Sequence, residues 1–180
     1  MTNAFVGHGY HQVTASSKWF IDLLNQHSAV KVFWDPLGHG GSRPDKSELL
    51  ECERIFVWQV EYIARELAEI VPHKLVFIPM WDGVQFEGDA FWRPFGQTRI
   101  LSFSWTLHER LRRLGLNSFH SQYFPDPARF RQVTDFSQLR GYLWQRRREI
   151  GWPQVAALSG GRQWHRFQFH AGMDPTYGEI

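Results

Sequence analysis

The feature that most constrains this fold is the alternation of short apolar segments with amphipathic helical patterns. Apolar segments predict strands at 4–6, 30–34, 55–58, 74–78, 100–103 and 117–124, so that strand starts recur about every 20 to 25 residues. After Lys74 the apolar run is continuous, which is typical of a parallel strand covered on both faces. This spacing predicts right-handed βαβ crossovers and an α/β fold with a Rossmann-like, doubly wound parallel sheet of about six strands.

Three longer helices are expected between these strands. Ser17 is one of three cap candidates for the first, and the second covers 62–71, where apolar residues share one face. The third is expected to start at Thr106, with Glu109 completing a capping box, and to end at Gly115.

In doubly wound sheets the ligand crevice lies beyond the carboxyl ends of the strands. The loops that should carry a site therefore begin at Gly7, Asp35, Trp58, Pro79 and Ser104. This placement depends only on the predicted strands.

The stretch from Arg99 to Phe130 contains one complete βαβ unit, which a Pro-Asp-Pro sequence at 125–127 then stops. Its ordered residues are Ser104, Glu109, Leu111, Gly115, Pro125, Asp126 and Phe130. Their order resembles the end of the N-terminal domain in GT-B glycosyltransferases, particularly the large retaining family 4. A βαβ unit of an unrelated α/β protein is the alternative explanation.

The resemblance implies transfer of a hexosyl group from a nucleotide sugar to a saccharide or lipid-linked acceptor, as in polysaccharide biosynthesis. It favours retention at the transferred carbon, makes the nucleotide sugar a substrate, and calls for no cofactor. Residues 1–127 would form the N-terminal, acceptor-side domain, and 128–180 the linker and the truncated start of the C-terminal donor-binding domain. The missing donor domain or a partner chain would be required, so the 180 residues alone are expected to show no useful transferase activity.

The first loop is expected to let the backbone approach a sugar or phosphate closely at Gly7 and Gly9. It departs from the dinucleotide fingerprint because Gln12 stands at the third glycine position, which disfavours nicotinamide or flavin binding. His8 is expected to contact sugar hydroxyls, and His11 is a catalytic candidate. Simple solvation of the two loop histidines is the alternative. The two histidines suggest a metal, but no cysteine or carboxylate cluster completes a zinc site, so no metal is expected.

Aromatic and acidic residues follow the later strands. Trp58 and Trp81 are expected to stack on the apolar faces of sugars, and Ser104 joins this acceptor-binding group. Asp82 is the second catalytic candidate, because a carboxylate can accept hydroxyl hydrogen bonds or act as a base. Turn chemistry is the alternative for Asp82, since Asp-Gly is a favoured turn pair. Glu61 is expected on a solvated helix face.

Beyond Pro127 the chain becomes basic. Arg146 and Arg147 are expected to bind the donor diphosphate, because the planar guanidinium matches phosphate oxygens. Solvated surface arginines are the alternative.

Composition limits the cellular context. The chain is 43% hydrophobic and 21% charged over 180 residues, which indicates a globular protein of one domain or one domain plus part of another. Cys52 is the only cysteine, and neither a signal-peptide pattern nor a membrane-spanning apolar run occurs, so a cytoplasmic location is expected. A lipid-linked acceptor would add peripheral association with a membrane. The net charge of +2 does not call for nucleic acid, and no nucleic-acid partner is expected.

Two other classes of function stay open. The first is a non-catalytic, nucleotide- or phosphate-binding regulatory module, for which a missing donor half would be no defect. The second is oligonucleotide binding through the basic tail, which is disfavoured because aromatic residues are not interleaved with the arginines.

Overall fold

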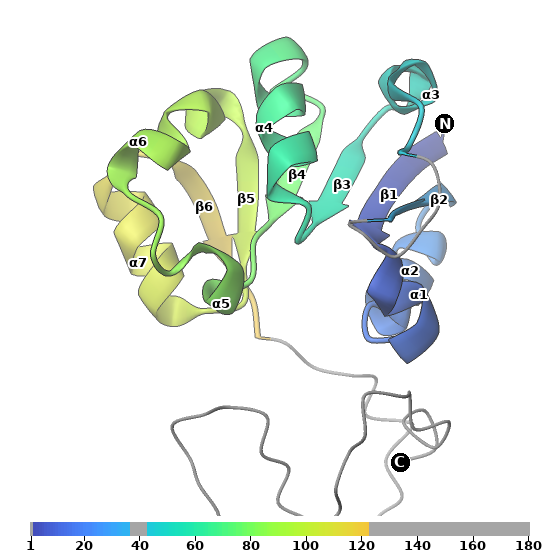
Figure 1. The fold of residues 1–180 in the computed structure, drawn as a ribbon, viewed down its shortest axis with the longest axis horizontal. Helices are drawn as coiled ribbons and strands as arrows, with labels where there is room; N and C mark the ends of the chain where they lie inside the picture. Colours follow the sequence, from blue (N-terminus) through green and yellow to red (C-terminus); the bar gives the residue numbers. More distant parts are fainter. Residues whose placement is uncertain (1, 37–42, 123–180) are drawn as a thin grey trace, which may run out of the picture. The chain divides into compact units, whose positions relative to one another are not determined.

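The computed structural model describes residues 2–36 and 43–122. They form the α/β fold that the sequence predicts, a Rossmann-like arrangement with six parallel strands in one sheet and helices on both faces (Figure 1). The strands are β1 (Thr2–His8), β2 (Ala29–Asp35), β3 (Ile55–Trp58), β4 (Leu75–Ile78), β5 (Arg99–Ser102) and β6 (Asn117–His120). The helices are α1 (Gly9–Thr14), α2 (Lys18–Asn25), α3 (Lys46–Glu51), α4 (Glu61–Ile70), α5 (Trp81–Val84), α6 (Asp89–Trp92), the 3-10 helix η1 (Arg93–Gln97) and α7 (Trp105–Arg113).

The strand order β2-β1-β3-β4-β5-β6 places the switch point of the topology between β1 and β3. Strand β2 pairs with one side of β1. The chain then crosses to the other side of β1, where β3, β4, β5 and β6 are added in order. The loops after β1 and β3 lead to opposite faces of the sheet, because α2 packs on one face and α4 on the other. Open parallel sheets bind ligands in the crevice at such a switch point, beyond the carboxyl ends of the strands.

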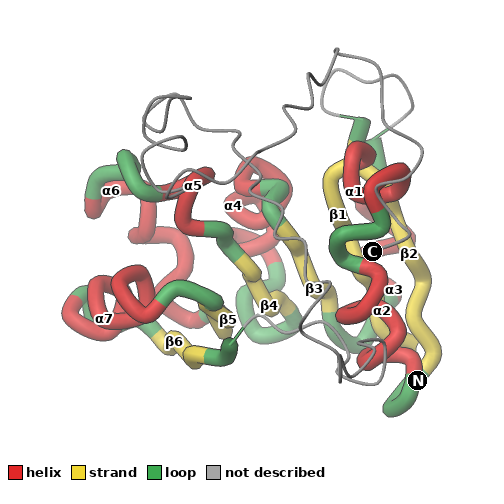
Figure 2. Tube along the Cα trace, turned by 90° about the horizontal axis from the view of Figure 1, so that it is seen from below, coloured by secondary structure: helices red, strands yellow, loops and turns green. Residues whose placement is uncertain are grey.

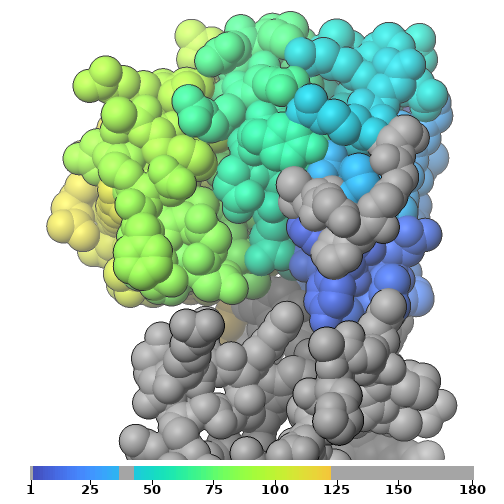
Figure 3. Space-filling view, in the orientation of Figure 1, coloured from blue at the N-terminus to red at the C-terminus, as the bar shows by residue number. Residues whose placement is uncertain are grey.

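Alternating strand side chains build one hydrophobic core on each face of the sheet. On one face Val57 packs with residues of α3, α4 and α7, among them Leu67. On the other face Trp58 packs with Phe5 and with Phe20 of α2. Figure 2 shows α1 and α2 beside β1 and β2. In the space-filling view the residues from α4 to α6, in shades of green, form much of the surface on the left and in the centre (Figure 3).

The strands lie within a few residues of their predicted positions. The helix starts differ from the prediction at three places, which are α1, α3 and α7. Helix α1 begins inside the predicted first loop, because His8 caps it by accepting a hydrogen bond at Nδ1 from the Tyr10 backbone N–H at 3.0 Å. The short helix α3 was not predicted. Asp45 caps it by accepting a hydrogen bond from the Ser47 backbone N–H at 2.8 Å. Strand β6 ends at His120, earlier than expected.

The third difference concerns α7, which begins at Trp105 and not after Thr106. Ser104 is its cap, and the Ser104 hydroxyl accepts a hydrogen bond from the Leu107 backbone N–H at 3.3 Å. The predicted capping box between Thr106 and Glu109 is therefore wrong. The predicted end is confirmed, because Gly115 follows the helix with a left-handed φ of 77°.

Ala15 provides a test of the backbone at the end of α1. It has a left-handed φ of 52°, which is costly for a residue with a Cβ atom. We expect Ala15→Gly to raise the free energy of unfolding by about 0.5–1 kcal/mol, measured by urea denaturation. The control is Ala90→Gly inside α6, where the same change should lower stability by a similar amount. Destabilisation by both changes would contradict this account of Ala15.

The expectations for the chain beyond residue 122 lie outside the described residues. They include the domain boundary after Pro127 and the second α/β unit, and both remain predictions.

Candidate functional site

The carboxyl ends of the six strands carry polar and aromatic side chains along one edge of the sheet. These are His8 at the end of β1 and His11 after it, Asp35 at the end of β2, Gln59 and Glu61 after β3, Trp81 and Asp82 after β4, Ser104 and Trp105 after β5, and His120 at the end of β6. The topology therefore brings together at one edge the predicted residues His8, His11, Trp81, Asp82 and Ser104. Their individual surroundings decide which of them could meet a ligand.

The two histidines after β1 lie close together. Their ring centroids are 5.9 Å apart, and His8 is already engaged as the cap of α1. Burial, and in second place the neighbouring His8, lowers the pKa of His11. Its Nδ1 atom is buried and has no hydrogen-bond partner among the described residues. The lowered pKa favours the neutral imidazole of His11, which is the form that can act as a base or as a hydrogen-bond acceptor.

Neither Gly7 nor Gly9 has room for a side chain. A Cβ atom on Gly7 would lie 2.8 Å from ring carbons of both Phe5 and Trp34, so the missing side chain accommodates aromatic packing. A Cβ atom on Gly9 would lie 2.9 Å from the backbone carbonyl oxygen of Asp35. Both glycines are therefore explained by close internal packing, and the expectation that their backbone approaches a sugar or phosphate remains a prediction.

Trp58 and Trp81 have different surroundings. Trp58 is 1% exposed and packs against Phe20 and Phe103, with ring centroids at 5.2 and 5.3 Å. A buried indole cannot offer a face to a sugar, so the predicted stacking role of Trp58 is replaced by a core role. Trp81 begins α5 and is only half-buried against the core. Of the two tryptophans, Trp81 is the one that can reach a ligand at this edge.

The ends of β3 and β4 carry two acidic side chains. Glu61 is half-buried in the first turn of α4, and Asp82 is exposed in the first turn of α5. The carboxylate of Glu61 lies over Gly83, because a Cβ atom there would be 2.9 Å from Glu61 Oε1. Burial raises the pKa of Glu61, and the charge of Asp82 adds to this effect.

Gln59 lies between the end of β3 and Glu61. It is a non-glycine residue with a left-handed φ of 58°, and its backbone N–H donates a hydrogen bond to the Ile78 carbonyl at 3.2 Å. Such backbone conformations are costly and are concentrated at binding and active sites. The conformation turns the chain sharply from β3 into α4 and so sets the position of Glu61.

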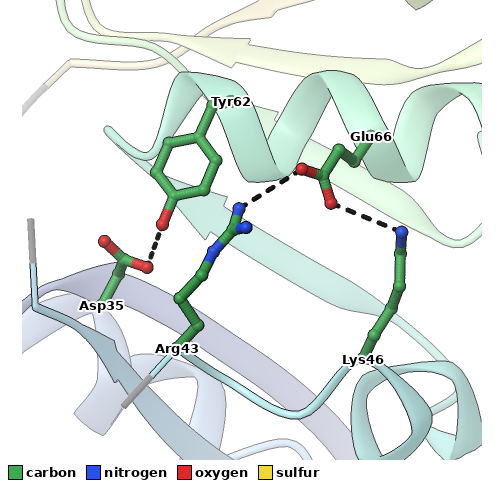
Figure 4. A network of polar contacts seen from close by, with 5 residues as sticks. All are labelled: Asp35, Arg43, Lys46, Tyr62 and Glu66. Atoms are coloured by element: carbon green, nitrogen blue, oxygen red, sulfur yellow. Dashed lines mark hydrogen bonds and ion pairs between the residues drawn. The ribbon is translucent and has the colours of Figure 1, made fainter. Parts of the chain in front are cut away.

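A polar network on the other side of the switch point ties the segment after β2 to α4 (Figure 4). The Tyr62 hydroxyl donates a hydrogen bond to the carboxylate of Asp35, which is 1% exposed. The Arg43 guanidinium lies over the Tyr62 ring at 4.4 Å from its centroid and pairs with Glu66 at 3.2 Å. Lys46 pairs with the second oxygen of Glu66 at 3.3 Å.

Of the residues in this network, Tyr62 is expected to contribute most to the free energy of unfolding. We expect Tyr62→Phe to lower the free energy of unfolding by about 1–3 kcal/mol, because the buried Asp35 carboxylate loses a donor. Urea denaturation provides the measurement. Lys46→Ala is the control and should change stability by less than about 0.5 kcal/mol, since its ion pair is exposed. Equal effects of the two changes would contradict the assignment.

The same hydroxyl predicts a pH dependence. Burial, followed by the hydrogen bond to Asp35, raises the pKa of Tyr62 to about 12. The folded state holds the phenolic proton more tightly than the unfolded state does. Stability from this group is therefore present below the ordinary tyrosine pKa of 10.0 and is lost as the pH rises toward about 12. The Tyr62→Phe variant should lose less stability than the wild type between pH 10.0 and about 12.

The sequence signals for Glu61, Gln59 and Tyr62 were absent or misleading. Glu61 was expected on a solvated helix face, and the structure shows it half-buried beside Gly83. The left-handed backbone conformation of Gln59 has no signature in the sequence. The contact between Asp35 and Tyr62 joins residues 27 positions apart and depends on the tertiary fold.

Other parts of the described surface offer weaker candidates. A shallow, open hollow lies at the opposite, amino edge of the sheet, where Cys52, Arg54, His73 and Lys74 are among its lining residues. No group of three or more metal-ligating side chains occurs in residues 2–36 and 43–122. Within those same ranges, each helix is too short or too polar to cross a membrane. Arg146 and Arg147 lie outside the described residues, so their diphosphate role remains a prediction.

Comparison of the chain with protein-family models, with curated proteins and with solved structures finds no match.

Proposed function

We propose that the chain binds a neutral saccharide acceptor at the carboxyl edge of its sheet, as the acceptor-side part of a GT-B-like glycosyltransferase. The observation that carries this proposal is the acidic pair Glu61 and Asp82 at the ends of β3 and β4, next to the switch point. The sequence resemblance at Ser104, Glu109 and Gly115 supports the same enzyme class.

The charge of this part of the edge favours a hydroxylated ligand without negative charge. The Glu61 carboxyl is influenced by the charges of both Asp82 and Glu87. A phosphate placed among three carboxylates would meet repulsion, whereas sugar hydroxyls can donate hydrogen bonds to them. This argument favours acceptor binding over the alternative of a nucleotide- or phosphate-binding module at this position.

The two carboxyl groups suit different tasks in transfer. Exposed Asp82 would accept hydrogen bonds from sugar hydroxyls, and Trp81 beside it would contact the apolar face of the ring. Half-buried Glu61, with its raised pKa, is suited to take up the proton of the reacting hydroxyl as the oxygen bonds to the donor's anomeric carbon and the nucleotide diphosphate departs. A base in this role must come within about 2.6–3.2 Å of the hydroxyl oxygen. Donor binding would fall to Arg146 and Arg147.

Chemical-shift mapping on the ¹⁵N-labelled full chain tests the proposal. The probes are neutral mono-, di- and trisaccharides of glucose, galactose, mannose and rhamnose, with uridine diphosphate in parallel. We expect saccharides to shift the backbone amides of Gln59, Glu61, Asp82 and Gly83, and uridine diphosphate to leave these four unchanged.

Two results would overturn the proposal. Shifts confined to the amino edge around His73 and Lys74 would place the ligand in the hollow there. Shifts of the Glu61 and Asp82 amides by uridine diphosphate, without any effect of the saccharides, would favour the nucleotide-binding module.

A further inference from the structure

An exposed indole stands farther along the same edge, outside the acidic pair. Trp105 is the first residue of α7 and follows Ser104 directly, and 60% of its surface is exposed. Exposed tryptophan is uncommon unless its ring contributes to recognition. The position of Trp105 next to a predicted acceptor-binding residue makes this exposure relevant to the site.

Two imidazole rings hold the indole in place. His120, at the end of β6, meets it edge-on with ring centroids 5.1 Å apart and an interplanar angle of 88°. His108, one turn along α7, lies 5.4 Å away. His108 is itself fixed by a 2.9 Å hydrogen bond between its Nδ1 and the hydroxyl of Ser118, which is 5% exposed. Trp105 therefore combines an accessible surface with support from two separate elements.

Two exposed phenylalanines differ from Trp105 in their surroundings. Phe86 is 92% exposed and Phe119 is 53% exposed. The described residues provide neither of them with a pair of bracing rings like that around Trp105. The imidazoles of His108 and His120 also place nitrogen atoms, which can form hydrogen bonds, next to the apolar ring of Trp105. This combination fits a sugar, which presents both C–H faces and hydroxyl groups, better than it fits a purely apolar partner.

The separation along the edge determines what kind of sugar could use both places. Strands of a sheet lie about 4.8 Å apart, so the ends of β4 and β6 are separated by about 10 Å. One sugar ring that contacts Asp82 after β4 cannot also extend to His120 at the end of β6, whereas a chain of two or more units can.

We propose that Trp105, His108 and His120 form a second saccharide subsite, and that the acceptor is an oligosaccharide whose reacting unit lies at Glu61 and Asp82. The preceding unit stacks on Trp105. This inference rests on the proposed function, because the reacting unit is placed by the acidic pair.

Affinity as a function of oligosaccharide length tests the subsite. The full chain is titrated with the mono-, di- and trisaccharide panel, as wild type and as Trp105→Ala, Trp105→Phe and Asp82→Asn. We expect the wild type to bind its preferred di- or trisaccharide about 5- to 10-fold more tightly than the corresponding monosaccharide. Trp105→Ala should abolish this preference and Trp105→Phe should retain part of it, whereas Asp82→Asn should weaken all lengths alike. Phe119→Ala is the control, an exposed aromatic on the same strand as His120, and should change nothing.

Each contrary outcome has a distinct meaning. Binding that depends on Asp82 but is equal for all lengths and insensitive to Trp105→Ala would overturn the subsite and leave the proposed function standing. An equal effect of Phe119→Ala and Trp105→Ala would also overturn it, because the platform would then not be specific. Absence of any saccharide binding by the wild type would overturn the proposed function and the subsite together.

Discussion

Replacement of Trp58 by alanine is expected to lower the free energy of unfolding by about 3–5 kcal/mol. The indole is 1% exposed and lies in the core between the sheet and α2, in ring contact with Phe5, Phe20 and Phe103. Its removal would leave a cavity among aromatic side chains that cannot collapse to fill it. Chemical denaturation with two independent probes provides the measurement.

Conservative changes separate the core role of Trp58 from a ligand-binding role. Trp58→Phe should retain most of the stability and all of the saccharide affinity. Trp81→Ala is the matched variant at the next strand end, because its indole is only half-buried, and it should cost less stability and more affinity. A stable Trp58→Ala protein that has lost saccharide binding would show that Trp58 acts in recognition after all.

Replacement of Glu61 by glutamine is expected to reduce saccharide affinity about 10- to 100-fold. Hydrogen bonds to charged groups contribute about 1.5–3 kcal/mol, and a tenfold change in affinity corresponds to about 1.4 kcal/mol. The change keeps the shape of the side chain over Gly83 and removes only the charge. Glu69→Gln is the control, because Glu69 is exposed on the same helix. This variant should bind saccharide with the same affinity as the wild type.

The same variant should show the opposite effect on stability. Burial raises the pKa of Glu61 in the folded state, so the folded chain binds the carboxyl proton more tightly than the unfolded chain does. The stability from this group is therefore highest below the ordinary glutamate pKa of 4.5 and is lost as the pH rises through the higher folded pKa. Glu61→Gln removes this loss and should be more stable than the wild type at pH 8, by thermal unfolding. A variant that is weaker in binding and also less stable at pH 8 would contradict this account.

The sheet could be predicted well because its strands are short, strongly apolar runs. The segment 55–58 matches β3 fully, and the strand spacing alone implied parallel crossovers. The capping of α7 was harder, since Ser104 and Thr106 have the same hydroxyl chemistry two positions apart. Only the extended backbone at Ser104, with φ −104° and ψ 122°, decides between them. Helix α3 was missed because six residues are too few to show a helical period.

The edge of the sheet that carries the site was also predictable, but the direction of each side chain was not. Trp58 was expected to stack on a sugar from the end of its strand, whereas its side chain shares the core face of Phe56. Glu61 and Glu69 belong to one helix and look alike in the sequence. Their difference comes from Gly83, which lies after β4 and approaches only Glu61.

Asp35 has a consequence for the entropy of binding. Its carboxylate accepts a hydrogen bond from Tyr62 in α4, and its carbonyl oxygen lies against Gly9 at the start of α1. The three segments that border the switch point are thus joined at one buried residue. A ligand that enters there meets a backbone that is pre-organised at these joined residues. We therefore expect association to follow a single fast step, with interface backbone movement of less than about 1 Å.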